Sequence, residues 1–378
     1  MKFVVAPDSF KGSISAYDAC LAIKRGIVKV ISGAEVVLNP IADGGEGTLD
    51  ATVSSEHRIC ANVSGPIFER VEAKFGYIGD TAVIEMACAA GLTLIPENCR
   101  NAGRTTTFGV GELILRALDM GFRKIMLTVG GSATNDGGCG MLSALGAKFI
   151  KKDGTEFVPV GDTLCEIENV DISGMAKGFF ECEFLIATDV KNPLLGEKGA
   201  TFVYAPQKGL EDGQKELLEV GMTHFASVLK TLSGKDVASA EGCGAGGGLP
   251  ATLLAFANSK IQSGIDTVLD ATGFSEAIKE ADAVITGEGK IDFQSLFGKA
   301  ISGVARICLE KKLPVYCFVG CVGEDTDKLK QVGLADIYEV SSLAESTEDS
   351  IKNAARYLEA LAQRFAADFL AKSRLEKD

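Results

Sequence analysis

The sequence predicts an α/β protein: a flavodoxin-like, doubly wound parallel sheet domain with a second, mixed α/β domain inserted into it. Three observations support this. Apolar runs alternate with amphipathic helical patterns at the start of the chain, and the same alternation returns at its end. The residues between these two parts show a different pattern of apolar and polar residues. We expect a discontinuous sheet domain at residues 1–60 and 270–378 and an inserted domain at 61–269, because insertions are tolerated at surface positions.

Two strand–helix units open the chain. Apolar runs at residues 2–7 and 35–40 predict buried strands, and helical spacing follows the first of them over about residues 15–30. Each strand leads into a polar, glycine-containing loop, DSFKGS at 8–13 and ADGGEGT at 42–48. Consecutive units of this kind predict parallel strands with right-handed connections.

The middle of the chain has another pattern. Three short strands joined by tight turns come first, with Gly79-Asp80 as a hairpin signal, and further strands, helices and glycine-rich loops follow. The expected strands are 58–65, 70–79, 81–88, 124–129 and 183–187, and the expected helices begin near 109, 141 and 214. A glycine run at 242–248 precedes an apolar helix, which favours a phosphate-binding loop over a flexible linker.

The alternation of strands and helices resumes near residue 264. The expected elements are strands at 281–286, 314–319 and 336–340 and a last helix at about 347–372. In a flavodoxin-like order the first strand lies beside the third, and ligands bind at the switch point between them. The segment from Asp8 to Lys11 is therefore expected beside the segment from Gly287 to Lys290, as two walls of one crevice.

The segment ITGEGKIDFQSLFGK at 285–299 is expected to combine a strand end, a turn at Gly287 and Gly289, and the start of a helix. This geometry presents backbone N–H groups to an anion. A helix cap is the alternative role for Asp292. A cap needs none of the flanking residues from Gly287 to Lys290, so a functional role is favoured.

Five loops close to a strand end combine acidic residues with hydroxyl or lysine residues, and all but the fourth also contain glycine: DSFKGS, ADGGEGT, GGSATNDGG, ATDVKNP and TGEGKID. Glycine permits close approach of the backbone to an anion, carboxylates can hold Mg²⁺, and lysines can neutralise phosphate. One such loop is more often a capped turn, but five in one chain favour a site. No Walker A sequence is present, and a GxGxxG fingerprint is met only in part.

Charge and composition narrow the function further. The net charge of −13 argues against nucleic acid or an anionic membrane as a partner, and no apolar run approaches about 18 residues. Eleven cysteines without a CxxC pair indicate reduced thiols in a cytoplasmic protein, and two histidines argue against a histidine-rich metal site. A homodimer is compatible with these properties.

Taken together, the loops resemble those of the bacterial glycerate kinase family. The matching segments are DSFKGSISA at 8–16, ADGGEGT at 42–48, GGSATNDGG at 130–138, TDVKNPL at 188–194, YAPQKG at 204–209 and TGEGKIDFQ at 286–294. The likeness runs in order from about residue 3 to about residue 370. It implies ATP-dependent phosphorylation of D-glycerate in glycerate or glyoxylate catabolism, with 2-phosphoglycerate favoured over 3-phosphoglycerate, and a flavodoxin-like domain that carries an inserted α/β domain.

Phosphoryl transfer requires a phosphate cradle, charge neutralisation, a metal and a base. The residues expected in catalysis are Asp189 and Asp292 as alternative bases and Lys11, Lys290 and Lys299 as cations. The residues expected to bind the substrate are Asp8, Ser9, Lys11, Asp43, Gly44, Glu46 and, as an outside candidate, Arg104. The residues expected to bind phosphate or nucleotide are Gly130, Gly131, Ser132, Asn135, Asp136, Gly244, Gly246, Gly247, Gly248, Gly287, Glu288 and Gly289. The expected ligands of Mg²⁺ are Asp43, Glu46 and Asp189.

Two other functions are alternatives. An oxidoreductase acting on a small hydroxy acid would share the fold, but no GxGxxG lies between a strand and a helix with an acid about 20 residues further on. A metabolite-binding protein without activity would bind its ligand and give no turnover. A coupled ADP-release assay separates that protein from a kinase.

Overall fold

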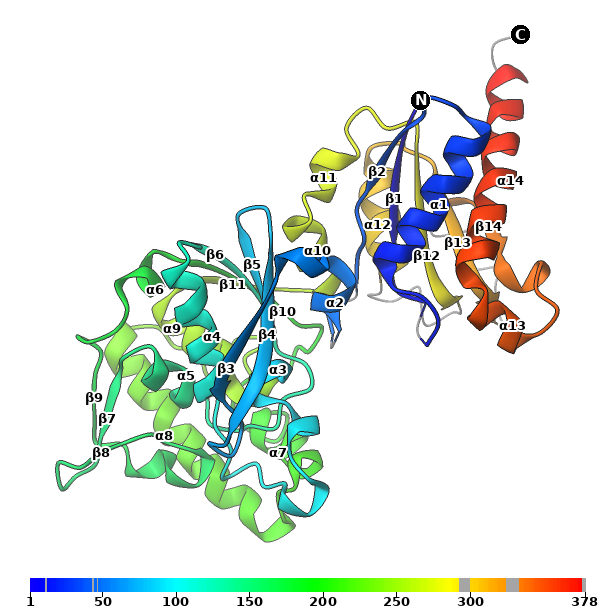
Figure 1. Ribbon diagram of the computed structural model, residues 1–378. Helices are drawn as coiled ribbons and strands as arrows, with labels where there is room; N and C mark the ends of the chain where they lie inside the picture. Colours follow the sequence, from blue (N-terminus) through cyan, green and yellow to red (C-terminus); the bar gives the residue numbers. More distant parts are fainter. Residues whose placement is uncertain (11, 43, 46, 292–299, 324–332, 376–378) are drawn as a thin grey trace. The chain divides into compact units, whose positions relative to one another are not determined.

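Two largely parallel sheets organise the chain, one in each of two compact units (Figure 1). The computed structural model describes residues 1–10, 12–42, 44–45, 47–291, 300–323 and 333–375. Unit 1 comprises Met1–Ser54 and Ile265–Asp378, and unit 2 comprises Ser55–Gly264. These limits differ by six and five residues from the expected boundaries at residues 60 and 269, and the division into two domains stays a prediction.

Unit 1 is built on a parallel sheet whose described strands have the order β14-β13-β12-β1-β2. The strands are β1 (Lys2–Pro7), β2 (Glu35–Leu38), β12 (Ala283–Ile291), β13 (Val315–Val322) and β14 (Leu334–Glu339). The first strand lies between the second and the third strand of the unit. This is the flavodoxin-like order, so the predicted fold class is confirmed.

Helices pack on both faces of this sheet because its strands are apolar on both sides. Helices α1 (Ala16–Val30) and α14 (Ala354–Leu375) cover one face, where Phe3 and Phe365 meet with ring centroids 5.8 Å apart. Helix α12 (Ala300–Glu310) packs on the other face. The shorter helices are α2 (Thr48–Thr52), α10 (Gly264–Ala271), α11 (Phe274–Ala277) and α13 (Thr347–Lys352).

Strand β12 runs further than expected. The sequence predicts a turn at Gly287 and Gly289, but the strand continues through both glycines to Ile291 and stays paired with β13. A Cβ atom on Gly287 would lie 2.0 Å from the carbonyl oxygen of Phe318, so this glycine permits the close approach of two strands. The predicted turn is therefore wrong, and the expected helix start with Asp292 lies outside the described residues.

Unit 2 has a sheet in the order β11-β10-β6-β5-β4-β3, in which β11, β10, β6 and β5 are parallel and β4 and β3 are antiparallel. Its strands are β3 (Arg58–Ser64), β4 (Arg70–Ile78), β5 (Thr81–Glu85), β6 (Lys124–Thr128), β10 (Glu183–Ala187) and β11 (Asn258–Gln262). A separate antiparallel sheet contains β7 (Lys148–Ile150), β8 (Glu156–Phe157) and β9 (Asn169–Asp171). The α-helices described in unit 2 are α3 (Ala87–Ala90), α4 (Phe108–Asp119), α5 (Cys139–Ala144), α6 (Lys177–Glu181), α7 (Ala200–Tyr204), α8 (Lys215–Ser233) and α9 (Leu249–Phe256).

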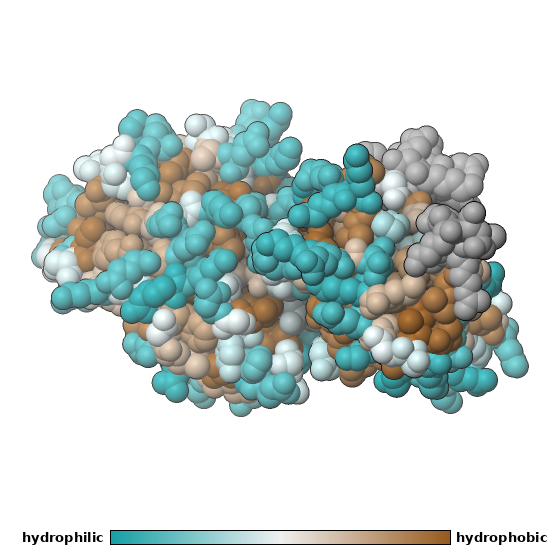
Figure 2. Space-filling view, turned by 90° about the horizontal axis from the view of Figure 1, so that it is seen from above, coloured by the Kyte–Doolittle hydropathy of each residue, from teal (hydrophilic) through white to brown (hydrophobic). Residues whose placement is uncertain are grey.

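Hydrophilic side chains are spread over the face shown in Figure 2, with apolar residues between them. Within the described ranges, no helix is long and apolar enough to cross a membrane. The two largest clusters of buried apolar side chains are separate, one in each unit.

Gly26 is a contact point between α1 and α14. A Cβ atom at this position would lie 2.3 Å from the carbonyl oxygen of Glu359 and 2.5 Å from the Cβ atom of Ala362. Gly26→Ala should therefore lower the free energy of unfolding by about 1–3 kcal/mol, because α14 must shift away even though alanine favours a helix. Chemical denaturation measures this change. Gly213→Ala, whose added Cβ would have no atom within 4 Å, is the control, and equal stability of the two variants would contradict this reading of the contact.

Candidate active site

A pocket opens in unit 1 where β1 and β12 end. Its volume is about 870 Å³, and its walls come from the loop after β1, from α2, from the ends of β12 and β13, and from the segment between Val340 and Ala354. Strands β1 and β12 are neighbours in the sheet. The strand that follows β1 in the chain, β2, lies toward one edge of the sheet, and the strand that follows β12, β13, lies toward the opposite edge. The pocket therefore lies at the switch point of the sheet, where open α/β folds bind ligands.

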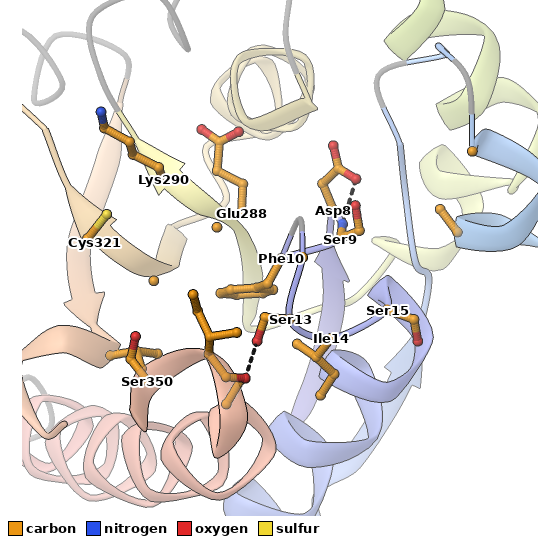
Figure 3. Close-up of a pocket in the computed structure, with 18 of the residues that line it drawn as sticks. Asp8, Ser9, Phe10, Ser13, Ile14, Ser15, Glu288, Lys290, Cys321 and Ser350 are labelled. Atoms are coloured by element: carbon orange, nitrogen blue, oxygen red, sulfur yellow. Dashed lines mark hydrogen bonds between the residues drawn. The ribbon is translucent and has the colours of Figure 1, made fainter. Parts of the chain in front are cut away.

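The loop after β1 forms one wall. Asp8 donates its backbone N–H to the carbonyl oxygen of Gly287 at 2.8 Å, which confirms that these two segments are neighbours. The loop then turns back on itself at Phe10, and the hydroxyl of Ser13 donates to the carbonyl oxygen of Ile351 at 2.6 Å. These contacts hold the loop in place, and Figure 3 shows the ring of Phe10 across the centre of the pocket.

The extended end of β12 forms the opposite wall. Glu288 and Lys290 are two residues apart on a strand, so both side chains leave the same face of the sheet, and Figure 3 shows both beside the pocket. Lys290 is paired with Cys321 of β13. Burial, reinforced by the carboxylate of Glu288, raises the pKa of the Cys317 thiol, so this cysteine is protonated at neutral pH.

The lining of the pocket contains both apolar and charged side chains. The apolar ones are Phe10, Ile14, Val340, Ile351 and Ala354. The charged ones among the described residues are the carboxylates of Asp8, Asp50 and Glu288 and the ammonium group of Lys290. Because the carboxylates outnumber the ammonium group, an anionic ligand would need an accompanying cation.

Five of the predicted site residues lie outside the described residues: Lys11, Asp43, Glu46, Asp292 and Lys299. Ser9 and Gly289 line the pocket together with Asp8, Glu288 and Lys290. Gly44 is buried and has a φ of 81°, a backbone conformation that glycine adopts without strain.

In unit 2 the loop after β6 exposes two of the predicted glycines. Gly130 and Gly131 are exposed, and Gly131 has a φ of 70°. The backbone N–H groups of Gly130, Gly131 and Ser132 donate to no other residue in the described part of the chain. Consecutive N–H groups of this kind can form a concavity for an anion. Phosphate binding at this loop stays a prediction that the geometry accommodates.

Asn135 and Asp136 are interior residues of the same loop. Both are fully buried. The carboxylate of Asp136 accepts from the backbone N–H and the hydroxyl of Thr107, both at 2.8 Å, and from the N–H groups of Gly138 and Gly140 at 3.0 and 3.2 Å. Burial raises the pKa of Asp136, and the four donors oppose this rise. This network gives Asp136 a structural role, and binding of a nucleotide at Asn135 and Asp136 stays a prediction.

The glycine run before α9 is also structural. Gly247 has a φ of 69°, and a Cβ atom on it would lie 2.0 Å from the carbonyl oxygen of Thr134. A Cβ atom on Gly244 would also contact a backbone carbonyl oxygen, at 2.3 Å. Gly244, Gly247 and Gly248 are buried, whereas Gly246 is partly exposed. The run allows neighbouring loops to pack closely, and phosphate binding at Gly244, Gly246, Gly247 and Gly248 stays a prediction.

Asp189 and Arg104 have different surroundings. Asp189 is exposed just beyond the end of β10, and one of its carboxylate oxygens accepts the backbone N–H of Gly264 at 3.0 Å. The guanidinium group of Arg104 is exposed and lies 3.5 Å from the carboxylate of Asp162. Asp189 is thus an accessible carboxylate at the carboxyl end of the sheet, whereas Arg104 belongs to a surface ion pair.

The structure also brings forward residues that the sequence did not single out. Thr347 and Ser350 line the pocket of unit 1, although no motif marks the helix that carries them. Lys208 is buried against the loop after β6 in unit 2. The match of YAPQKG at 204–209 was the one available signal for this lysine.

Replacing Asp136 tests its structural role. Asp136→Asn should lower the free energy of unfolding by about 2–4 kcal/mol, because an amide N–H₂ group would face backbone N–H donors. Thermal unfolding followed by near-ultraviolet circular dichroism measures the loss. Asp119→Asn, at an exposed position of α4, is the matched control in the same unit. Equal melting temperatures of the two variants would show that the network around Asp136 adds no stability.

Comparisons with known proteins agree on one family. The model of the Glycerate kinase family matches residues 3–370. The glycerate kinase of Bacillus subtilis (strain 168) is 42% identical over 378 residues and 99% of each chain, and the glycerate 2-kinase of Escherichia coli (strain K12) is 40% identical over 358 residues and 94% of each chain. A solved crystal structure from Salmonella typhimurium LT2 matches with a TM-score of 0.88, 38% identity and 99% coverage of both chains. The chain therefore belongs to the glycerate kinase family.

Proposed function

We propose that the chain transfers the γ-phosphoryl group of ATP to the 2-hydroxyl group of D-glycerate with the help of Mg²⁺. Membership of the family makes it a kinase of glycerate, and our proposal concerns the donor, the metal and the position of phosphorylation. The relative from Escherichia coli is named a glycerate 2-kinase, which supports the 2-position.

The pocket of unit 1 is the observation that carries the proposal. Its volume of about 870 Å³ is in the range of cofactor sites and exceeds what a three-carbon acid fills. The apolar side chains of Phe10 and Ile351 suit a nucleoside base. Gly289 and Lys290 offer an accessible backbone and a positive charge to phosphate groups. We therefore assign the nucleotide to this pocket.

The excess of carboxylates in the pocket is compatible with a bound Mg²⁺ ion. Among the residues that the structure describes, no group of three or more His, Cys, Asp or Glu side chains could hold a metal ion alone. A Mg²⁺–nucleotide complex takes most of its ligands from phosphate and water, so one or two carboxylates suffice. Asp8 and Glu288 line the pocket and could supply them, and Asp43, Glu46 and Asp189 are the ligands expected from the sequence. When bound, the metal would neutralise phosphate charge.

The reaction moves one phosphoryl group and one proton. The O2 atom of glycerate forms a bond to the γ-phosphorus, the bond from that phosphorus to the bridging oxygen breaks, and ADP leaves. The hydroxyl proton passes to a carboxylate. Asp189 is the exposed candidate for this base in unit 2, and Asp292 is the other predicted base. Lys290 offsets the charge of the transferred group, a role also expected of Lys11 and Lys299.

Product analysis tests the proposed reaction. The purified chain should release ADP when ATP, Mg²⁺ and D-glycerate are present together, and chelation of the metal should stop the release. In the ³¹P spectrum the product should couple to the single proton on C2. Coupling to the two protons of C3 would place the phosphate at the other hydroxyl. An absence of ADP release, with turnover by another nucleotide, would overturn the choice of ATP.

Replacing Lys290 tests the position of the nucleotide. Lys290→Met should raise the KM for ATP by about 10- to 100-fold, because a charged contact to phosphate is worth about 1.5–3 kcal/mol. The side chain is exposed, so the melting temperature should not change. Steady-state kinetics at saturating D-glycerate give the KM. Lys24→Met, at an exposed position of α1 away from the pocket lining, is the control, and a KM as low in Lys290→Met as in this control would remove Lys290 from the site.

A further inference from the structure

Lys208 is a buried lysine that the proposed reaction does not use. It ends a short 3₁₀ turn between α7 and α8 and is only 3% exposed. Its Nζ atom donates to the hydroxyl of Ser132 at 2.9 Å and to the carbonyl oxygen of Thr134 at 2.8 Å. A Cβ atom on the following Gly209 would lie 2.3 Å from the carbonyl oxygen of Arg100, so the backbone of this turn is closely packed. The packing directs the lysine into the loop after β6.

The loop that Lys208 contacts is held from several other sides. The carbonyl oxygen of Gly131 accepts from the backbone N–H of Leu92 at 2.9 Å. The N–H of Ala133 donates to the carbonyl oxygen of Ala90 at 2.8 Å. The carbonyl oxygen of Ala133 accepts from the hydroxyl of Thr105 at 2.9 Å. These bonds leave the N–H groups of residues 130–132 without an acceptor in the described part of the chain. Lys208 thus supports, from the interior, a loop whose N–H groups at residues 130–132 can receive an anion.

We propose that Lys208 positions this loop and couples the binding of an anion at residues 130–132 to the uptake of a proton by its own amine. The inference rests on the proposed function only in taking the anion to be the carboxylate or phosphate of a substrate. A neutral amine has two N–H donors, which match Ser132 and Thr134, whereas an ammonium group has three donors and a full positive charge. An anion on the neighbouring N–H groups stabilises the ammonium form.

Burial brings the amine close to the pH at which it titrates. Desolvation lowers the pKa of Lys208 to about 7, and the carboxylate of Asp136 on the same loop limits this drop. The two groups that hydrogen-bond the amine do not titrate. Arg100, whose carbonyl oxygen packs against Gly209, is a further charged residue next to this turn. Near neutral pH the amine is present in both forms, so a bound anion can shift the balance.

The direction of the effect follows from the lowered pKa. Above about pH 7 the free protein carries mainly the neutral amine, and anion binding takes a proton from the solvent. The affinity for the anion should therefore fall as the pH rises from about 7 to 9, while kcat need not follow. The free energy of unfolding should rise between about pH 7 and 10, because the unfolded lysine binds a proton that the folded one has lost.

Binding calorimetry of the full chain tests the coupling. We would titrate D-glycerate and, separately, Mg²⁺–ADP in buffers of different ionisation enthalpy at about pH 8, where both probes are fully ionised. Proton uptake approaching about one should accompany the probe whose anion occupies the loop, which distinguishes a carboxylate from a phosphate. The measurement needs no turnover. A chain that binds with proton uptake and does not phosphorylate glycerate would contradict the proposed function and leave this inference standing.

Two variants of the same residue separate charge from titration. Lys208→Arg keeps a permanent charge, so it should bind the probe without proton uptake and without the pH dependence. Lys208→Met has neither, so it should bind about tenfold more weakly and also lack the rise of stability above pH 7. Lys152→Met, at an exposed position of the same unit, is the control and should take up protons as the wild type does.

Two results would overturn the proposal. One is binding of both probes by the wild-type chain with no proton uptake, as expected if Lys208 only holds the loop. The other is wild-type proton uptake by Lys208→Met. The first needs no variant, so it decides the question even where the substitutions prevent folding.

Discussion

The parallel pairing of β1 with β12 is the constraint on which the rest of unit 1 depends. The hydroxyl of Thr286 donates to the carbonyl oxygen of Ala6 at 2.9 Å, across 280 positions of the chain, and the N–H of Asp8 continues the pairing to Gly287. The entropy of closing a loop grows only slowly with its length, so a long excursion between these strands is tolerated. Because the pairing sets which loops are neighbours, it also creates the pocket at the end of the two strands.

Close approach between backbones is the second requirement, and glycine meets it in both units. Gly287 lies against Phe318 in the sheet of unit 1, and Gly247 lies against Thr134 in the loops of unit 2. In both places a Cβ atom would collide with a carbonyl oxygen. Gly130 differs, because a Cβ atom there would meet nothing within 4 Å. Glycine-rich motifs in this chain therefore include both packing positions and exposed backbone, and only the exposed backbone is available to a ligand.

The sequence by itself determined the fold class, the order of the strands in unit 1 and the family. Apolar runs and helical spacing are local patterns, and the handedness of strand–helix–strand connections limits how they assemble. The adjacency of Asp8 and Gly287 followed from that order alone. The resemblance to the family was specific because each matched loop agrees with the family at several residues with fixed spacing. Site residues that line the unit 1 pocket, such as Glu288 and Lys290, could be predicted because they lie toward the carboxyl end of a strand at the switch point of the sheet.

The tertiary structure decided which residues of the predicted loops face a ligand and which face the interior. Asp136 lies in a matched motif, but its carboxylate is used by donors that include Thr107, on another segment. Lys208 carries no local signal of burial, and its partner Ser132 lies 76 positions away. The exposure and hydrogen bonding of a loop are set by segments distant in the sequence. A local pattern therefore shows where a loop occurs, and only the packing around it shows which of its atoms remain accessible.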